Sequence, residues 1–140
     1  MILLDTSGVL AWIDAAQRQH ADVVAAMAEV EPPFFLSPFV LAELDYLLAT
    51  RVGPHAQLAL LDEVAHGAFA LEHFSAGDVA SAQDLIRKYP RLEIGLADAS
   101  IVVLAERHRC FEVLTLDERH FRTVRAPRGE AFRLLPADRL

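Results

Sequence analysis

The stretch Ile2-Leu3-Leu4-Asp5-Thr6-Ser7 decides the fold, because a short apolar run stops abruptly at a polar, helix-capping cluster. Three consecutive apolar residues of this kind predict a buried strand. Asp, Thr and Ser are favoured at the N-termini of helices, so residues 8–16 are expected to be helical. A strand followed at once by a helix is typical of a parallel α/β sheet.

The same alternation of strand and helix patterns runs through the rest of the chain. Further strands are predicted at 34–36, 69–71, 112–116 and 132–135, and further helices at 20–30, 39–51, 56–65, 75–89 and 97–108. Apolar strands separated by helices indicate a parallel sheet that is covered on both faces. We therefore predict a three-layer α/β/α fold with a central, mostly parallel sheet, in which residues 132–135 form an edge strand. The length of 140 residues fits one domain, residues 1–140.

Charge is divided unevenly along the chain, whose net charge is −7. Residues 1–86 carry 12 acidic side chains and two arginines, whereas residues 87–140 carry eight acidic side chains, ten arginines and one lysine. The net charge argues against a nucleic-acid partner. The Arg-rich part argues for one, since guanidinium groups match phosphate oxygens. Codon bias in a GC-rich genome is the alternative explanation of the arginine content.

No secretory or membrane segment is predicted. No basic region precedes the apolar start of the chain, and the longest apolar run, near Ile101 to Ala105, is far shorter than the roughly 20 residues that span a bilayer. The only cysteine, Cys110, cannot form an internal disulfide, which fits a reducing compartment. We expect a cytoplasmic protein in which Cys110 is a buried core thiol.

Four acidic side chains are predicted to lie at one edge of the sheet. Asp5 and Asp117 directly follow strands, while Glu43 and Asp98 lie in the first two turns of helices. Ligands of such sheets bind outside the carboxyl ends of the strands. Two carboxylates about 4 Å apart repel each other by roughly 4 kcal/mol at an effective dielectric constant of 20, and a divalent cation relieves that repulsion. The simpler alternatives are helix caps for the three aspartates and a solvent-exposed side chain for Glu43.

An all-oxygen ligand set indicates the chemistry that such a site performs. It selects Mg²⁺ or Mn²⁺, which keep several bound waters. A metal-bound water is more easily deprotonated, and the ion neutralises charge on a phosphoryl oxygen, so we expect hydrolysis of a phosphodiester. The chain lacks a phosphate-binding loop, a dinucleotide fingerprint, zinc-type histidine spacing and a Gly-x-Ser-x-Gly elbow.

The residues around these acids form an ordered set of four segments. They are Ile2-Leu3-Leu4-Asp5-Thr6-Ser7, Ser37-Pro38-Phe39-Val40-Leu41-Ala42-Glu43-Leu44, Leu96-Ala97-Asp98-Ala99-Ser100-Ile101 and Leu114-Thr115-Leu116-Asp117-Glu118-Arg119-His120-Phe121. In this order and spacing the chain resembles, nearly end to end, the PIN-domain ribonucleases, and specifically the toxins of VapBC toxin–antitoxin systems.

This resemblance implies an endoribonuclease that depends on Mg²⁺ or Mn²⁺ and cleaves structured RNA, either tRNA or ribosomal RNA. It implies that Asp5, Glu43, Asp98 and Asp117 bind the metal and form the catalytic site. Thr6 and Thr115 match positions that are often polar in the family and are expected to support these acids. The resemblance further implies a homodimer and neutralisation by a VapB-like antitoxin.

Two further features bear on partners. The helix around Phe39 to Ala49 is apolar on almost all sides, which indicates burial in the monomer or contact between its second face and a partner helix. Arg119 and Arg122 follow Asp117 and are expected to contact RNA phosphates. Two other functions remain open: a non-catalytic PIN-like binding module, and a metal-dependent phosphohydrolase of small molecules.

Overall fold

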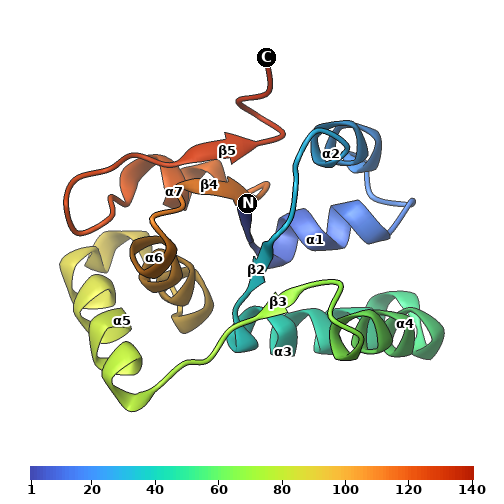
Figure 1. Ribbon diagram of the computed structural model, residues 1–140, viewed down its shortest axis with the longest axis horizontal. Helices are drawn as coiled ribbons and strands as arrows, with labels where there is room; N and C mark the ends of the chain where they lie inside the picture. Colours follow the sequence, from blue (N-terminus) through green and yellow to red (C-terminus); the bar gives the residue numbers. More distant parts are fainter.

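The computed structural model describes all 140 residues, and it contains the predicted alternation of strands and helices (Figure 1). The elements follow one another as β1 (Ile2–Leu4), α1 (Thr6–Ile13), α2 (His20–Met27), β2 (Phe34–Leu36), α3 (Pro38–Leu47), a π-helical turn (Leu48–Val52), α4 (Pro54–Ala65), β3 (Ala70–Leu71), α5 (Ala76–Lys88), a 3₁₀ turn (Pro90–Leu92), α6 (Leu96–His108), β4 (Glu112–Leu114), α7 (Glu118–Thr123) and β5 (Arg133–Leu135).

The five strands form one sheet in the order β3-β2-β1-β4-β5, and every neighbouring pair is parallel. The predicted fold class is thereby confirmed, and β5 is an edge strand as expected. The first strand of the chain lies at the centre of the sheet, where Leu3 is level with Phe35 of β2 and with Val113 of β4. This position explains why Ile2, Leu3 and Leu4 are all buried: helices cover the central strand on both faces.

The helices form the two outer layers of the molecule. Figure 1 shows α1 and α2 on one side of the sheet and α5 and α6 on the other, with α3 and α4 side by side below β3. Because all strands are parallel, their carboxyl ends lie at one edge of the sheet, and the starts of α1, α3 and α7 follow directly from it.

Several element boundaries differ from the prediction, among them the end of α2 at Met27 rather than residue 30 and the end of β4 at Leu114 rather than residue 116. α1 ends at Ile13 rather than at residue 16, because the carboxylate of Asp14 accepts hydrogen bonds from the Ala16 amide and the Gln17 side chain and so closes a turn. The helix predicted at 39–51 is α3 followed by the π-helical turn. The turn at 118–121 is a short helix, α7, because Asp117 caps it.

Gly8 allows α1 to lie directly against β4. A Cβ atom at this position would lie 2.5 Å from the carbonyl oxygen of Leu114 and 2.6 Å from its carbonyl carbon. Both are backbone atoms of a central strand, so they cannot move aside as a flexible side chain would. This close approach sets the distance between the start of α1 and the end of β4, the two places that supply Asp5 and Asp117.

Two further predictions concern burial. Cys110 is a free thiol with 2% of its surface exposed, so the prediction of a buried core cysteine is confirmed. No helix in the structure combines the length and the apolar character that crossing a bilayer requires.

Candidate active site

Asp5 is a buried carboxylate at the carboxyl end of β1. Only 5% of the residue is exposed, and no Lys, Arg or His side chain forms an ion pair with it. Its Oδ2 atom accepts hydrogen bonds from the hydroxyls of Thr115 (2.6 Å) and Ser7 (3.1 Å). Burial raises the pKa of Asp5 from 3.8 to about 6, and the negative charge of Asp98 acts in the same direction, against the hydrogen bonds from the two hydroxyls.

The two hydroxyls that contact Asp5 also hold the segment after β4. Ser7 Oγ accepts a hydrogen bond from the Leu116 amide at 3.0 Å, and Thr115 Oγ1 accepts one from the Asp117 amide at 2.9 Å. Asp5 is therefore not a helix cap for α1, since its side chain makes no capping hydrogen bond. Instead it joins the start of α1 to the end of β4, and this supports the predicted role of Thr115.

Asp98 and Asp117 come together around His120. The Nδ1 atom of His120 lies 2.9 Å from Oδ2 of Asp117 and 3.2 Å from Oδ2 of Asp98. The Nε2 atom donates a hydrogen bond to the carbonyl oxygen of Leu92 at 2.9 Å, because a carbonyl can only accept. Burial raises the pKa of Asp98, the nearby His120 opposes this, and the charges of Asp117 and Glu43 add to it.

Asp98 and Asp117 also act at the ends of helices, as the simpler interpretation proposed. Asp117 Oδ1 accepts a hydrogen bond from the His120 amide at 3.1 Å and caps α7. Asp98 Oδ2 accepts a long hydrogen bond, 3.5 Å, from the Gly95 amide before α6. Each carboxylate has a second oxygen, so capping a helix does not prevent either from binding another ligand.

Glu43 lies at the exposed rim of this group, in the second turn of α3. Its Oε1 atom accepts a 2.7 Å hydrogen bond from Thr6, which is the predicted supporting role for that threonine. The neighbouring acid Asp45 points to α4 instead, where it accepts a hydrogen bond from Gln57 at 2.7 Å. The start of α3 is held near α6 by buried Ser37 and Ser100, whose hydroxyls are 2.6 Å apart.

All four predicted acids are therefore close enough for their charges to interact. The charge of Asp98 raises the pKa of Asp5, and the charges of Asp117 and Glu43 raise the pKa of Asp98. No three acidic, His or Cys side chains are arranged so that all three would bind one ion as they stand. The donor chemistry fits a hard divalent cation for two reasons. All four acids offer carboxylate oxygens, and the buried carboxylate of Asp5 has no cationic partner.

His120 was not assigned a role from the sequence. Its spacing from Asp117, three residues along α7, is the one local signal that could have indicated a contact. The contact with Asp98 has no such signal, because it depends on α7 packing against the segment before α6. His120 is thus a residue of the candidate site that only the fold identifies.

The two arginines predicted to contact RNA differ in their surroundings. Arg122 donates to Asp138 at 2.6 and 2.8 Å and to Glu118 at 3.0 Å, so its charge is already neutralised. Arg119 has no acidic partner and donates only to the carbonyl oxygen of Arg91, at 3.4 Å. The structure therefore favours Arg119 over Arg122 as a residue available to phosphate.

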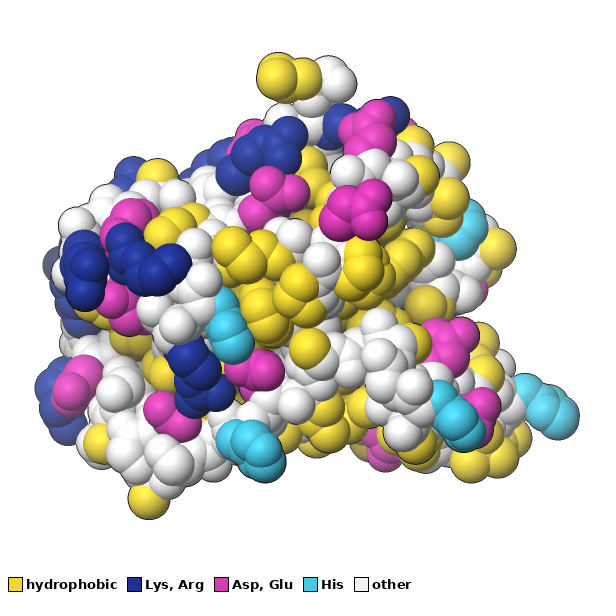
Figure 2. All heavy atoms as spheres, in the orientation of Figure 1, with side chains coloured by type: hydrophobic (Ala, Val, Ile, Leu, Met, Phe, Trp, Pro, Cys, Tyr) yellow, Lys and Arg dark blue, Asp and Glu magenta, His cyan; other side chains and the backbone are white.

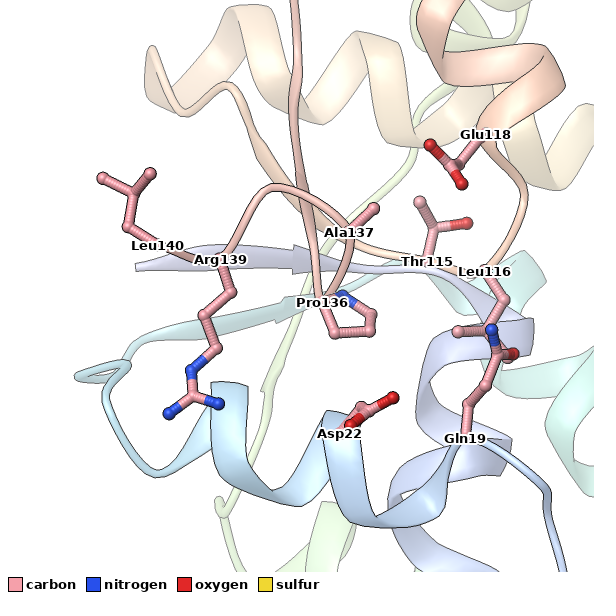
Figure 3. Close-up of a pocket in the computed structure, with 9 residues that line it drawn as sticks. All are labelled: Gln19, Asp22, Thr115, Leu116, Glu118, Pro136, Ala137, Arg139 and Leu140. Carbon is pink, nitrogen blue, oxygen red and sulfur yellow. The ribbon is translucent and has the colours of Figure 1, made fainter.

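A cavity of about 460 Å³ lies on the other flank of the end of β4 (Figure 3). Thr115, Leu116 and Glu118 form one wall, and the start of α2 and the C-terminal residues form the rest. Figure 3 shows Asp22 on the floor of this space and Glu118 above it. The guanidinium of Arg139 is ion-paired with Glu29 at 3.0 Å, so the lining offers little attraction to phosphate.

A sheet whose carboxyl edge gathers four acids is the arrangement that the predicted family would have. The sequence model of the PIN domain matches residues 2–126. The chain belongs to the PIN-domain family. Ribonuclease VapC26 of Mycobacterium tuberculosis is 44% identical to this PIN domain over 135 residues, which cover 96% of the chain and 100% of that relative. The predicted resemblance to PIN-domain toxins of the VapC type is thus confirmed.

Solved structures share the fold of this PIN domain. VapC20 of M. tuberculosis, described as a toxin that cleaves the sarcin–ricin loop, superposes with a TM-score of 0.79 at 23% identity, covering 85% of this chain and 92% of that chain. A toxin–antitoxin complex from Klebsiella pneumoniae superposes with a TM-score of 0.65 at 22% identity, covering 89% and 92%. At these identities the two structures support the fold, whereas VapC26 supports the family relationship.

Proposed function

We propose that this PIN domain is a metal-dependent endoribonuclease, a toxin of the VapC type that cleaves structured RNA and is held inactive by an antitoxin. The observation that carries the proposal is the gathering of Asp5, Asp98 and Asp117 at the carboxyl edge of the sheet, with Glu43 at its rim. Assembling four acids costs energy through burial and mutual repulsion, as the raised pKa values of Asp5 and Asp98 reflect. The 44% identity with a ribonuclease along the whole chain supports the same activity.

Asp5, Glu43, Asp98 and Asp117 would hold Mg²⁺ or Mn²⁺. A bound divalent ion of this kind supplies a more acidic water and neutralises charge on a phosphoryl oxygen. The side chains of the protein prepare the site for it. Both hydroxyl hydrogen bonds to Asp5 go to Oδ2, which fixes the carboxylate and leaves Oδ1 without a side-chain partner. In the reaction, water adds to phosphorus, one P–O ester bond breaks, and the departing oxygen takes up a proton.

The shape of the site favours a polymer over a small molecule. A cavity of about 380 Å³ contains Glu43 and Thr6 but neither Asp98 nor Asp117, and the larger cavity of Figure 3 lies beside the acids without enclosing them. Most binding sites for small molecules are clefts that enclose the ligand. A row of acids along an open edge is suited instead to a phosphodiester within a long chain.

An antitoxin would bind on the surface of α3 and α4. Val40, Leu44 and Leu48 bury one face of this region in the core, whereas Tyr46 on α3 is 67% exposed and Leu58 on α4 is 63% exposed. A hollow of about 300 Å³ lies between the end of α1, the π-helical turn and α4. One of the structural relatives, from K. pneumoniae, was solved as a toxin–antitoxin complex, and this supports a partner of the same class. An apolar face of this kind accommodates an amphipathic helix.

The test is a comparison of two acids on the same helix. Glu43→Gln and Asp45→Asn each remove one negative charge from α3, but only Glu43 belongs to the site. With purified protein, Mn²⁺ and total tRNA or ribosomal RNA as substrates, we expect Glu43→Gln and Asp98→Asn to lose about 100-fold or more in cleavage rate, and Asp45→Asn to retain it. Cleavage that persists in EDTA, or that Asp98→Asn does not reduce, would refute the proposal. Hydrolysis of nucleoside monophosphates in place of RNA would identify a small-molecule phosphohydrolase.

A further inference from the structure

The basic side chains of the protein divide into those that have an acidic partner and those that have none. Of 13 Lys and Arg residues, seven form an ion pair with a carboxylate. The six without such a pair are Arg18, Arg51, Lys88, Arg91, Arg119 and Arg125. These six are the basic side chains whose charge no carboxylate of the protein neutralises by direct contact, so they are the ones available to an anionic partner.

Four of these six cations lie in one region, which we call the basic patch: Lys88, Arg91, Arg119 and Arg125. Lys88 ends α5, Arg91 lies in the 3₁₀ turn, and the two others belong to α7 and the residues just after it. Direct contacts hold these segments together. Arg119 donates to the carbonyl oxygen of Arg91, and the Arg125 amide donates to the hydroxyl of Tyr89 at 3.2 Å. Lys88 and Arg125 line the same cavity of about 540 Å³, whose three acids, Asp78, Asp84 and Glu106, each pair with a different arginine.

The basic patch adjoins the candidate active site. His120, which contacts Asp98 and Asp117, follows Arg119 in the chain, and its Nε2 atom donates to the carbonyl oxygen of Leu92, the residue after Arg91. The patch and the acids are therefore joined by the same two segments, α7 and the 3₁₀ turn. Figure 2 shows the uneven division of charge over the molecule as a whole: on its visible face Lys and Arg side chains lie mainly over α5, α6 and β5, next to Asp and Glu, whereas none is visible over α3 and α4.

The two flanks of the candidate site differ in charge: the basic patch lies on one side, and the cavity of Figure 3 lies on the other. The cavity of Figure 3 contains Asp22 and Glu118, and its one guanidinium is paired with Glu29, so a phosphate chain gains nothing there. Four exposed cations without acidic partners repel one another, and a polyanion relieves that repulsion while releasing its own counterions. A run of phosphates therefore fits the patch better than a single phosphate group, because the cations are spread over three segments.

We propose that Lys88, Arg91, Arg119 and Arg125 bind the phosphate backbone of the RNA substrate on one side of the scissile bond, so that the strand runs from the acids across α7 toward the end of α5. The inference rests on the proposed ribonuclease function. It also reconciles a net charge of −7 with an RNA partner, because these four cations have no acidic partner that would compete with phosphate. Arg122, although next to the site, takes no part, because Asp138 and Glu118 already neutralise it.

The test measures how binding depends on salt, with unfractionated tRNA as the probe and the wild-type protein in EDTA, where no metal-dependent cleavage occurs. The slope of log affinity against log salt concentration counts the phosphates that are neutralised. We expect Arg91→Gln and Arg119→Gln each to reduce the magnitude of that slope by about 0.7 to 0.9, and the variant with all four residues replaced to reduce it by about 3. The four side chains are exposed, so the variants should keep the thermal stability of the wild type.

The matched control is Arg133→Gln. Arg133 is also a partly exposed arginine, but it is paired with Glu112 at 2.9 Å at the opposite edge of the sheet, where β4 and β5 begin. The salt slope should not change in this variant. An unchanged slope in the fourfold variant, an equal effect of Arg133→Gln, or no binding of tRNA by the wild type would each overturn the proposal. A fourfold variant that loses antitoxin binding but retains RNA binding would assign the patch to an acidic protein segment instead.

The outcome is separable from the test of the proposed function. If tRNA binding depends on the patch but Mn²⁺ produces no cleavage, the nuclease proposal fails and the patch remains an RNA-binding surface. If Mn²⁺ produces cleavage that Asp98→Asn abolishes, while the patch variants bind and cleave RNA like the wild type, only the inference about the patch fails.

Discussion

Replacing Asp5 by Asn should stabilise the metal-free protein at neutral pH, although it removes a carboxylate of the candidate active site. Raising the pKa of a carboxyl group from 3.8 to about 6 corresponds to a free energy of about 3 kcal/mol. The folded protein binds the proton more tightly than the unfolded chain does. The stability that this group contributes is therefore complete below about pH 4 and is lost as the pH rises through 6.

Asn at position 5 stays neutral, so the variant should not suffer this loss. The difference in unfolding free energy between Asp5→Asn and the wild type should grow by about 3 kcal/mol between pH 4 and pH 7.5, in favour of the variant. A constant offset of about 1 kcal/mol is expected from altered hydrogen bonds with Thr115 and Ser7, and taking the difference between the two pH values removes it. Urea denaturation in EDTA at the two pH values measures both the pH-dependent difference and the constant offset.

Metal binding should reverse the order of stability. Mn²⁺ should raise the melting temperature of the wild type, because a ligand that binds only the folded state stabilises it, and it should raise that of Asp5→Asn much less. Asp22→Asn is the control: it removes an exposed carboxylate outside the group of four acids, so Mn²⁺ should raise its melting temperature as much as that of the wild type. A pH-independent difference for Asp5→Asn would refute the reasoning that the buried charge is unfavourable in the metal-free state.

Three further predictions concern residues around the site. His120→Ala should lower the metal-free stability by about 1–3 kcal/mol, measured by urea denaturation, because it removes a buried hydrogen bond and the imidazole that lies between two acids; Mn²⁺ should recover most of this loss. Gly8→Ala should cost about 3 kcal/mol or prevent folding, as circular dichroism would reveal, because the new methyl group meets the backbone of Leu114. Tyr46→Ser and Leu58→Ser should each keep the stability of the wild type within about 0.5 kcal/mol but weaken antitoxin binding in a pull-down or calorimetric titration; unchanged binding by the double variant would exclude the α3–α4 surface.

The fold was predictable wherever a feature is local. The apolar run at residues 2–4 and the polar residues after it specify a strand and a helix start without help from the rest of the chain. The positions of Asp5 and Asp117 then follow from the rule that parallel strands end at one edge. The acids were thus placed correctly at one edge of the sheet, whereas the ends of α1 and α3 were not, because they depend on side-chain contacts of a turn and on packing.

The parts of the site that escaped prediction are set by contacts between distant segments. His120 meets Asp98 only because α7 packs against the 3₁₀ turn before α6, and no pattern within α7 specifies that neighbour. The difference between Arg119 and Arg122 likewise depends on Asp138, which the C-terminal residues bring back to α7. Metal binding by the four acids stays a prediction, which the cleavage and melting experiments address.

The order of the strands has a consequence for the protein during its own synthesis. The central strand is made first, and the hydroxyl that holds Asp5 arrives with Thr115, 110 residues later. A growing chain on the ribosome that has completed α4 contains two of the four acids and the surface we assign to the antitoxin, but not Asp98 or Asp117. The proposed nuclease site is therefore assembled last, and the helices that we assign to the antitoxin emerge early. For a protein that would damage the cell that makes it, this strand order delays the formation of the site until Asp98 and Asp117 have been synthesised.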